Sequence, residues 1–178
     1  MKFALISLGC SKNLVDSENF IGILVNKRGF EVTSELGEAD IIIVNTCGFI
    51  GDAKKESIET ILEVSDLKIN GNLKKIIVTG CLAQRYAGEI LKELPEVDAV
   101  IGTGEIDKIE KVIEEVLADK RVVESTKMDF LADSETDRVL TTASHTAYLK
   151  IAEGCDRKCT YCIIPQLRGN LRSRTIED

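Results

Sequence analysis

The sequence predicts an α/β fold built on an open, mostly parallel sheet, and two observations carry this prediction. Over the first 120 residues, short runs of β-branched residues alternate with amphipathic stretches, which is the pattern of βα units. The chain has 178 residues, of which 44% are hydrophobic and 30% charged, a balance typical of globular domains with a sizeable core. Disordered and collagen-like architectures are therefore excluded.

Each element of this fold has a signal in the sequence. Strands are expected at short apolar runs, over residues 2–8, 41–45, 75–79 and 99–101. Helices are expected where apolar residues recur at helical spacing, over residues 16–28, 53–67, 84–94 and 106–118. Gly29 and Pro95 occupy the stop positions of the first and third helices. This alternation predicts one compact α/β domain.

The pattern loosens after Arg121. Residues 129–146 are rich in Ser, Thr and Asp, as expected of a linker or crossing segment, and residues 148–152 are expected to form a new strand. We therefore expect a first domain over residues 1–135 and a second that begins at 136 and runs to 178.

Charge and hydropathy limit the location of the protein. The net charge is −7, yet residues 141–178 carry a small basic excess. No segment approaches the roughly 18 apolar residues that a membrane span needs, and the apolar stretch near the start is too short for a secretory signal. We therefore expect a cytoplasmic protein without membrane contact, in which six cysteines are metal ligands or redox groups rather than disulfides.

One set of three cysteines lies in a short loop directly after a predicted strand. Cys155, Cys159 and Cys162 form a C-x3-C-x2-C pattern that can fold around one metal centre. Three thiolates on a four-iron cluster leave one iron open to a substrate or cofactor. A zinc site is the alternative, because His145 could complete a Cys3His tetrahedron from ten residues upstream of Cys155.

The other three cysteines are far apart in the sequence but occupy equivalent positions. Cys10, Cys47 and Cys81 each follow a predicted strand and precede a helix, and the residues beside them include Gly9, Gly48 and Gly80. The carboxyl edge of an open α/β sheet is where ligands bind, so the fold can bring these thiols together at a second metal centre. The alternative is three buried cysteines that act as small apolar residues of the core.

The two cysteine sets together resemble the radical S-adenosylmethionine (SAM) methylthiotransferases. The resemblance implies that Cys155, Cys159 and Cys162 hold a 4Fe-4S cluster that chelates SAM, and it implies a SAM contact for Tyr161, immediately before the third of them. It also implies an auxiliary 4Fe-4S cluster on Cys10, Cys47 and Cys81. The implied fold is an N-terminal methylthiotransferase domain followed by the start of a radical SAM partial βα barrel.

Several segments are similar to the RimO branch of this family, whose members modify an aspartate of the twelfth small-subunit ribosomal protein. They are residues 10–13, 16–18, 45–50 and 53–58, and the residues after the cysteine loop (Ile164-Pro165, Arg168-Gly169 and Ser173-Arg174) also look like the family. A small-subunit ribosomal protein is therefore the implied substrate. The tRNA branch, which is MiaB-like, and a zinc-stabilised binding module without catalysis are the alternatives; the electron donor and the catalytic side chains are not indicated.

The length departs from the family pattern. A βα barrel needs roughly 200 residues, yet the chain stops 16 residues after Cys162. We therefore expect a chain that ends inside its catalytic domain and is inactive by itself, with most SAM-binding residues elsewhere.

Overall fold

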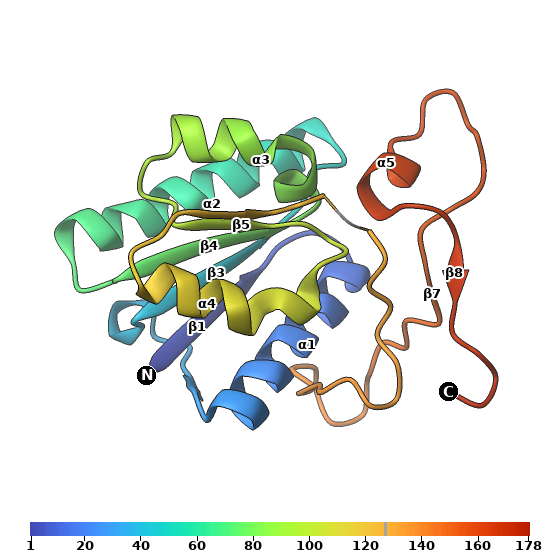
Figure 1. Ribbon diagram of the computed structural model, residues 1–178, viewed down its shortest axis with the longest axis horizontal. Coiled ribbons are helices and arrows are strands. Elements are labelled where there is room, and N and C mark those ends of the chain that lie inside the picture. Colours follow the sequence, from blue (N-terminus) through green and yellow to red (C-terminus); the bar gives the residue numbers. More distant parts are fainter. Residues whose placement is uncertain (127) are drawn as a thin grey trace.

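The computed structural model describes residues 1–126 and 128–178, and its centre is a parallel sheet. Within these residues the sheet has six strands: β1 (Lys2–Ser7), β2 (Glu31–Val32), β3 (Ile41–Thr46), β4 (Lys75–Gly80), β5 (Ala99–Ile101) and β6 (Val122–Glu124). Their order is β2-β1-β3-β4-β5-β6, and every neighbouring pair is parallel (Figure 1). The predicted α/β class with a parallel sheet is thereby confirmed.

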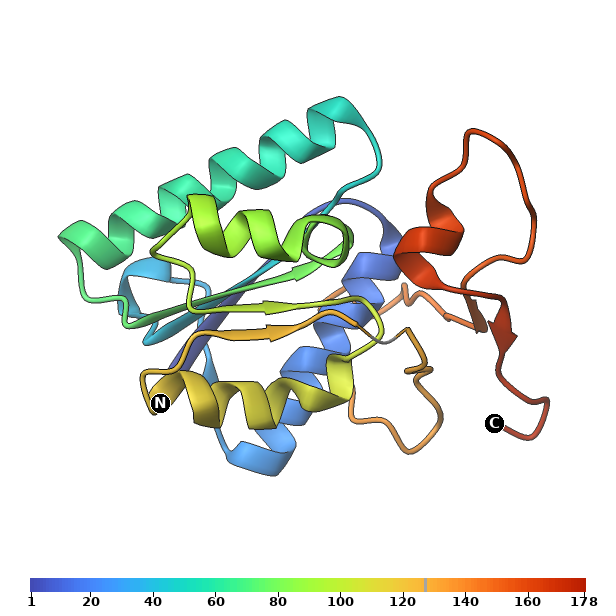
Figure 2. The same ribbon diagram turned by 45° about the horizontal axis from the view of Figure 1, so that its top comes forward.

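Helices cover both faces of this sheet (Figures 1 and 2). They are α1 (Ser11–Arg28), α2 (Gly51–Asn70), α3 (Cys81–Glu93) and α4 (Ile109–Leu117), and short 3-10 turns lie at Leu36–Glu38 and Ile106–Lys108. The pair α2 and α3 lies on one face, and the pair α1 and α4 on the other. In the described part of the chain, no helix combines the length and the hydrophobicity that crossing a membrane would require.

The core has two halves because strand side chains alternate between the faces. On β3, Ile41 and Ile43 pack with residues of α1 and α4, whereas Ile42 and Val44 pack with residues of α2 and α3. All four are fully buried, as expected for a central strand of a parallel sheet that is covered on both sides. The strands are held in the sheet by this packing, and the loops beyond their carboxyl ends begin where the packed strands stop.

The last part of the chain lies beside the carboxyl ends of the central strands. It contains β7 (Ala152–Glu153), α5 (Ile164–Arg168) and β8 (Arg172–Ser173), and β7 pairs antiparallel with β8. Figures 1 and 2 show this segment next to the N-terminal end of α1, with α5 turned toward the sheet domain. That it begins a barrel, and that the domains divide at residue 135, stay predictions.

Several element boundaries differ from those predicted. Helix α1 begins at Ser11 instead of 16, and α3 begins at Cys81 instead of 84, with a kink at Tyr86. The expected strand over residues 148–152 is wrong except at Ala152, and the short strands β2 and β6 were not predicted. These strands of two or three residues exist because a neighbouring strand offers hydrogen-bond partners, which no local sequence pattern reveals.

Candidate metal centres beyond the carboxyl edge of the sheet

The three widely spaced cysteines meet at one pocket. Strands β1, β3 and β4 are neighbours in the sheet, and Cys10, Cys47 and Cys81 lie in the first residues after their carboxyl ends. All three line a pocket of about 390 Å³. Its other lining residues come from the loops after β1 and β3, from the first turns of α1 and α2, and from α5: Gly9, Lys12, Asn13, Phe49, Ile50, Ala53, Ile164, Leu167 and Arg168. The fold thus brings together thiols that are more than thirty residues apart in sequence.

The cysteines differ in how far they are covered. Cys10 is exposed, Cys47 is half-buried, and Cys81 is buried but still faces the pocket. Cys81, the first residue of α3, is 7% exposed, as a core cysteine would be, and it also lines the pocket with the other two cysteines. Ser57 of α2 fixes the second loop, since its hydroxyl oxygen accepts a hydrogen bond of 3.0 Å from the Cys47 amide.

Gly9 allows two of the cysteine loops to approach each other. Its φ of +91° lies in the region that side chains disfavour, and a Cβ there would stand 2.9 Å from the Cys47 Cβ and 3.3 Å from its Sγ. Any larger residue would therefore push the loop of Cys47 away from that of Cys10. Glycine at this position is a requirement of the close approach.

Asn13 contacts the surroundings of all three cysteines, although the sequence singled it out only as part of a motif. Its Nδ2 donates hydrogen bonds of 3.0 Å to the carbonyl oxygens of Leu8 and Thr46, which precede Cys10 and Cys47. Its Oδ1 lies 3.9 Å from the Cys81 Sγ. No pattern in the sequence marks a buried asparagine as the shared partner of the backbone before Cys10 and Cys47 and of the Cys81 thiol.

The environment of Cys81 keeps its thiol protonated in the metal-free protein. Burial raises the pKa of Cys81, the nearby Arg168 guanidinium opposes that rise, and the thiols of Cys47 and Cys10 add to it. Thiolate is the form that binds metal, so metal binding must displace this proton. Metal uptake at this pocket is therefore favoured by higher pH.

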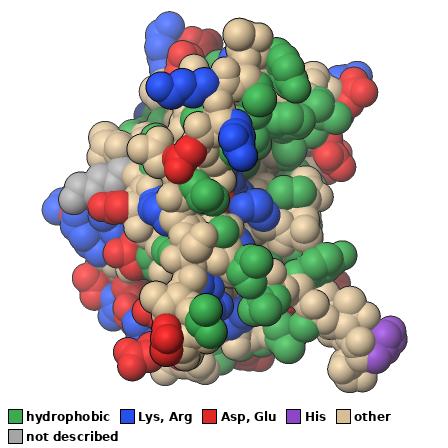
Figure 3. Space-filling model, turned by 90° about the vertical axis from the view of Figure 1, so that its right-hand side faces the viewer, with side chains coloured by type: hydrophobic (Ala, Val, Ile, Leu, Met, Phe, Trp, Pro, Cys, Tyr) green, Lys and Arg blue, Asp and Glu red, His purple; other side chains and the backbone are tan. Residues whose placement is uncertain are grey.

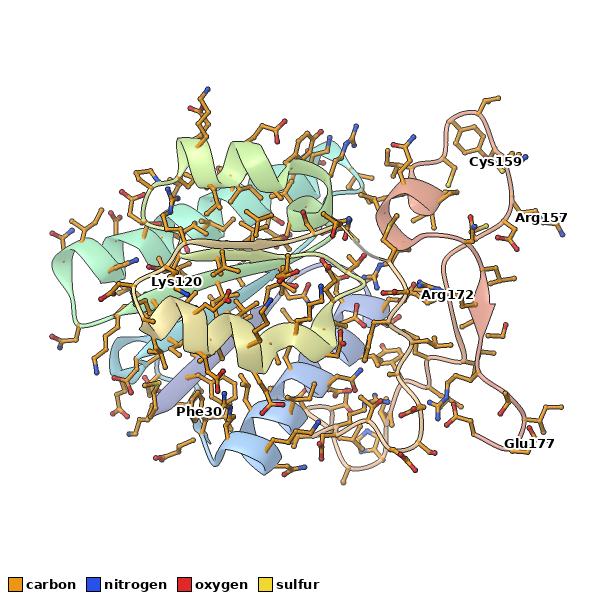
Figure 4. All side chains as sticks on the ribbon, in the orientation of Figure 1. Phe30, Lys120, Arg157, Cys159, Arg172 and Glu177 are labelled. Atoms are coloured by element: carbon orange, nitrogen blue, oxygen red, sulfur yellow. The ribbon has the colours of Figure 1, made fainter. Side chains whose placement is uncertain are left out.

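The second cysteine set lines a different pocket. Cys155, Cys159 and Cys162 face a space of about 520 Å³ that is also lined by residues of α5 and by Asp156, Arg157, Lys158, and Asn170. Figure 4 shows Cys159 and Arg157 on the outer loop of the C-terminal segment, far from the sheet. The loop is closed by the Cys162 amide, which donates to the Cys159 carbonyl at 3.1 Å.

Two other sequence-predicted residues lie outside this pocket. Tyr161 is 91% exposed and does not line the space that the three cysteines share. His145 is exposed and lines a separate surface hollow over residues 140–147, so the structure does not assemble the Cys3His zinc site. Across the described ranges 1–126 and 128–178, no three His, Cys, Asp or Glu side chains stand close enough to hold a single ion.

A cluster of buried charges lies beside the sheet-edge pocket. Arg168 of α5 is 3% exposed and lies between the carboxylates of Asp16 and Glu153, at 2.7 and 2.9 Å. Lys150 also pairs with both of these carboxylates. Figure 3 shows the face that carries this segment, with Lys and Arg side chains near its centre and hydrophobic side chains gathered in its upper right part.

Glu153 gives this arrangement a pH dependence that can be measured. Burial raises the pKa of this carboxyl, but Arg168 and Lys150 outweigh burial and hold the pKa at about 2, well below its ordinary value. A carboxyl with a depressed pKa stabilises the fold above its unfolded-state pKa, and that contribution is lost as pH falls from about 4.5 toward 2. We expect the stability difference between the wild type and Glu153→Gln, measured by urea unfolding, to shrink over this range. A difference that stayed constant between pH 6 and pH 3 would contradict the assignment.

Fold and pockets together define the class of protein: a parallel α/β domain with one cysteine-lined pocket at its carboxyl edge and a second in the loop beside it. Residues 2–102, more than half of the chain, match the model of a family described as "Uncharacterized protein family UPF0004". The chain belongs to this family.

Curated relatives extend the similarity over the whole chain. A protein of Lachnoclostridium phytofermentans named "Ribosomal protein uS12 methylthiotransferase RimO" is 56% identical over 177 residues, which are 99% of this chain and 40% of the relative. A protein of the same name from Clostridioides difficile is 53% identical over 178 residues, again 40% of its length. The predicted resemblance to the RimO branch is confirmed, and the chain spans about 40% of the length of these relatives.

Proposed function

We propose that this chain is the N-terminal part of a methylthiotransferase that uses SAM radical chemistry to add a methylthio group to an aspartate of the small-subunit ribosomal protein uS12. The identity of 50% or more to relatives that carry this name, extending through both cysteine sets, is the observation that carries the proposal. Because such a substrate is made and assembled in the cytoplasm, we propose that the protein acts there. Its electron donor is left open.

The residues present fit two iron–sulfur clusters. Each pocket offers three thiols, the number that leaves one iron of a 4Fe-4S cluster open to another ligand. At the sheet edge, the pocket also offers a glycine where a Cβ would collide with Cys47. We propose that Cys155, Cys159 and Cys162 hold the cluster that chelates SAM, that Cys10, Cys47 and Cys81 hold an auxiliary cluster, and that Tyr161 contacts SAM.

Bound at these positions, the clusters and SAM would supply the electron transfer, the radical chemistry and the methyl group of the reaction, and the auxiliary cluster would carry or relay the sulfur. The side chains of this chain bind, orient and shield. At the sheet edge, Ile164 and Leu167 of α5 and Phe49 give the pocket apolar walls beside the thiols. Lys12 and Arg168 bring positive charge to the same pocket, which offsets the negative charge of bound thiolates.

The proposed domains follow from the same placement. Residues 1–135 form the methylthiotransferase domain that carries the auxiliary site, and residues 136–178 begin the radical SAM domain. In support of this division, the parallel sheet is complete by β6, and the second cysteine set lies in the segment beyond it.

The substrate can be identified by mass spectrometry of ribosomal protein and tRNA from cells with and without the full-length gene. We expect a methylthio adduct on an aspartate of uS12 that disappears when the gene is deleted and returns when it is supplied again. If deletion of the gene left uS12 unchanged but removed a methylthio group from tRNA, the result would instead support a tRNA methylthiotransferase. Colourless protein with stoichiometric zinc, after anaerobic purification, would instead support a zinc-stabilised binding module.

A further inference from the structure

The wall of the sheet-edge pocket that faces its cysteines is made by α5, which directly follows the loop of the other cysteine set. Arg168, the last residue of α5, lines this pocket and is 3% exposed. A buried guanidinium has a large desolvation cost, which is compensated only by several well-placed partners. The position of Arg168 therefore depends on what its nitrogen atoms contact.

Arg168 contacts three parts of the molecule through one guanidinium group. Its Nη1 donates to the carboxylates of Asp16 on α1 and Glu153 on β7, and its Nη2 donates to Asn13 Oδ1 at 2.5 Å. Asp16 and Glu153 are 3% and 2% exposed, so these are buried, charge-assisted hydrogen bonds. The C-terminal segment is thus joined to the sheet domain at the side chain that also reaches the pocket.

Asn13 extends this connection to the cysteine loops. The same side chain that accepts from Arg168 donates to the carbonyl oxygens of Leu8 and Thr46 and lies 3.9 Å from the Cys81 Sγ. The backbone carbonyl of Asn13 in turn accepts a hydrogen bond of 2.8 Å from the Asn45 side chain on β3. A single chain of contacts therefore runs from α5 to the loops of Cys10 and Cys47 and to the side chain of Cys81.

We propose that Arg168 is a positioning residue that, through Asn13, sets the loops of Cys10 and Cys47 and the start of α3 at Cys81 in register with the segment that carries the other three cysteines. The planar guanidinium presents its donors to two carboxylates and one amide oxygen in a fixed geometry that the compact ammonium of lysine does not reproduce, so lysine cannot replace it fully. The spacing between the two cysteine pockets depends on this contact. The proposal concerns the loops themselves and rests on the proposed function only where it refers to clusters.

Hydrogen exchange in the metal-free, full-length protein tests the link without any cluster. In Arg168→Gln we expect backbone amides of residues 8–14 and 45–48 to exchange about tenfold faster, the change that follows when a charge-assisted hydrogen bond no longer opposes local opening. Arg168→Lys keeps the charge and should give a smaller increase. Because the lysine variant keeps the charge and disturbs the fold less, its exchange rates can be compared with those of the wild type if Arg168→Gln does not fold.

Arg138→Gln is the matched control. Arg138 also joins the later part of the chain to α1 by a partly buried ion pair, with hydrogen bonds of 3.0 and 2.6 Å to Glu18, but it does not line the cysteine pocket. This variant should speed exchange near residues 139–141 and leave residues 8–14 and 45–48 unchanged. The proposal is overturned if Arg168→Gln loosens α5 alone, or if both variants accelerate the cysteine loops equally.

A spectroscopic readout separates positioning from general stability. In full-length protein whose Cys155, Cys159 and Cys162 are alanine, the sheet-edge site is the remaining candidate cluster site. Arg168→Gln should shift the electron paramagnetic resonance signal of that cluster, Arg168→Lys should restore part of the shift, and Arg138→Gln should leave it unchanged. An unshifted signal in Arg168→Gln overturns the proposal. Absence of iron in every variant would count against the proposed function, and the exchange result would still decide the role of Arg168.

Discussion

Replacing Cys155, Cys159 and Cys162 by alanine in the full-length protein is expected to remove about half of its iron and to abolish reductive cleavage of SAM. These thiols share one pocket, so they should act as a unit. The site that chelates SAM is lost with them, and no other group in the described residues is proposed to replace it. Iron and sulfide analysis of anaerobically purified protein, together with chromatography of the SAM cleavage product, measures both effects.

The other cysteine set is the control for this experiment. Replacing Cys10, Cys47 and Cys81 by alanine should remove the other half of the iron, about as much as the first variant loses, and leave SAM cleavage detectable. The three cysteines share one pocket at the edge of β1, β3 and β4, so we expect their replacement to remove the whole cluster. If this variant kept all of its iron, the proposal of an auxiliary cluster would be refuted. The proposal of a SAM-chelating cluster would not be affected.

Gly80→Ala is expected to destabilise the fold by about 3 kcal/mol. Gly80 ends β4 directly before Cys81 with φ of +93° and ψ of −162°, a conformation nearly restricted to glycine. A Cβ there would lie 2.4 Å from the Thr46 carbonyl oxygen and from Asn45 Oδ1. Because the first contact is with the backbone of the neighbouring central strand, neither side can relax cheaply. Urea unfolding monitored by circular dichroism measures the loss.

Gly88→Ala is the matched substitution within the following helix. Gly88 lies inside α3, and nothing stands within 4 Å of the Cβ that alanine would add. Alanine loses less conformational entropy than glycine in a helix, so this variant should gain about 0.5 to 1 kcal/mol of stability. Equal effects of the two substitutions would contradict the conformational requirement at Gly80.

The sequence by itself determined the class of fold and both cysteine sets. The apolar runs of β1, β3, β4 and β5 are local signals, because strands covered on both faces are mainly apolar. The position of Cys47 and Cys81 directly after such strands, and of Cys10 three residues after another, already placed them at one edge. The resemblance carried by the same residues then indicated the family to which the relatives belong.

Only the tertiary structure decided how α1 begins and what joins the two cysteine pockets. The first turns of α1 bury Asn13, Asp16 and Glu18, polar residues that no apolar pattern marks as buried, because their partners Arg168 and Arg138 come from more than a hundred residues later. The spacing of hydrophobic residues reveals helix faces that bury apolar side chains. It does not reveal helix faces that are buried by paired charges. The helix start and the Arg168 contact were therefore hidden from the sequence for the same physical reason.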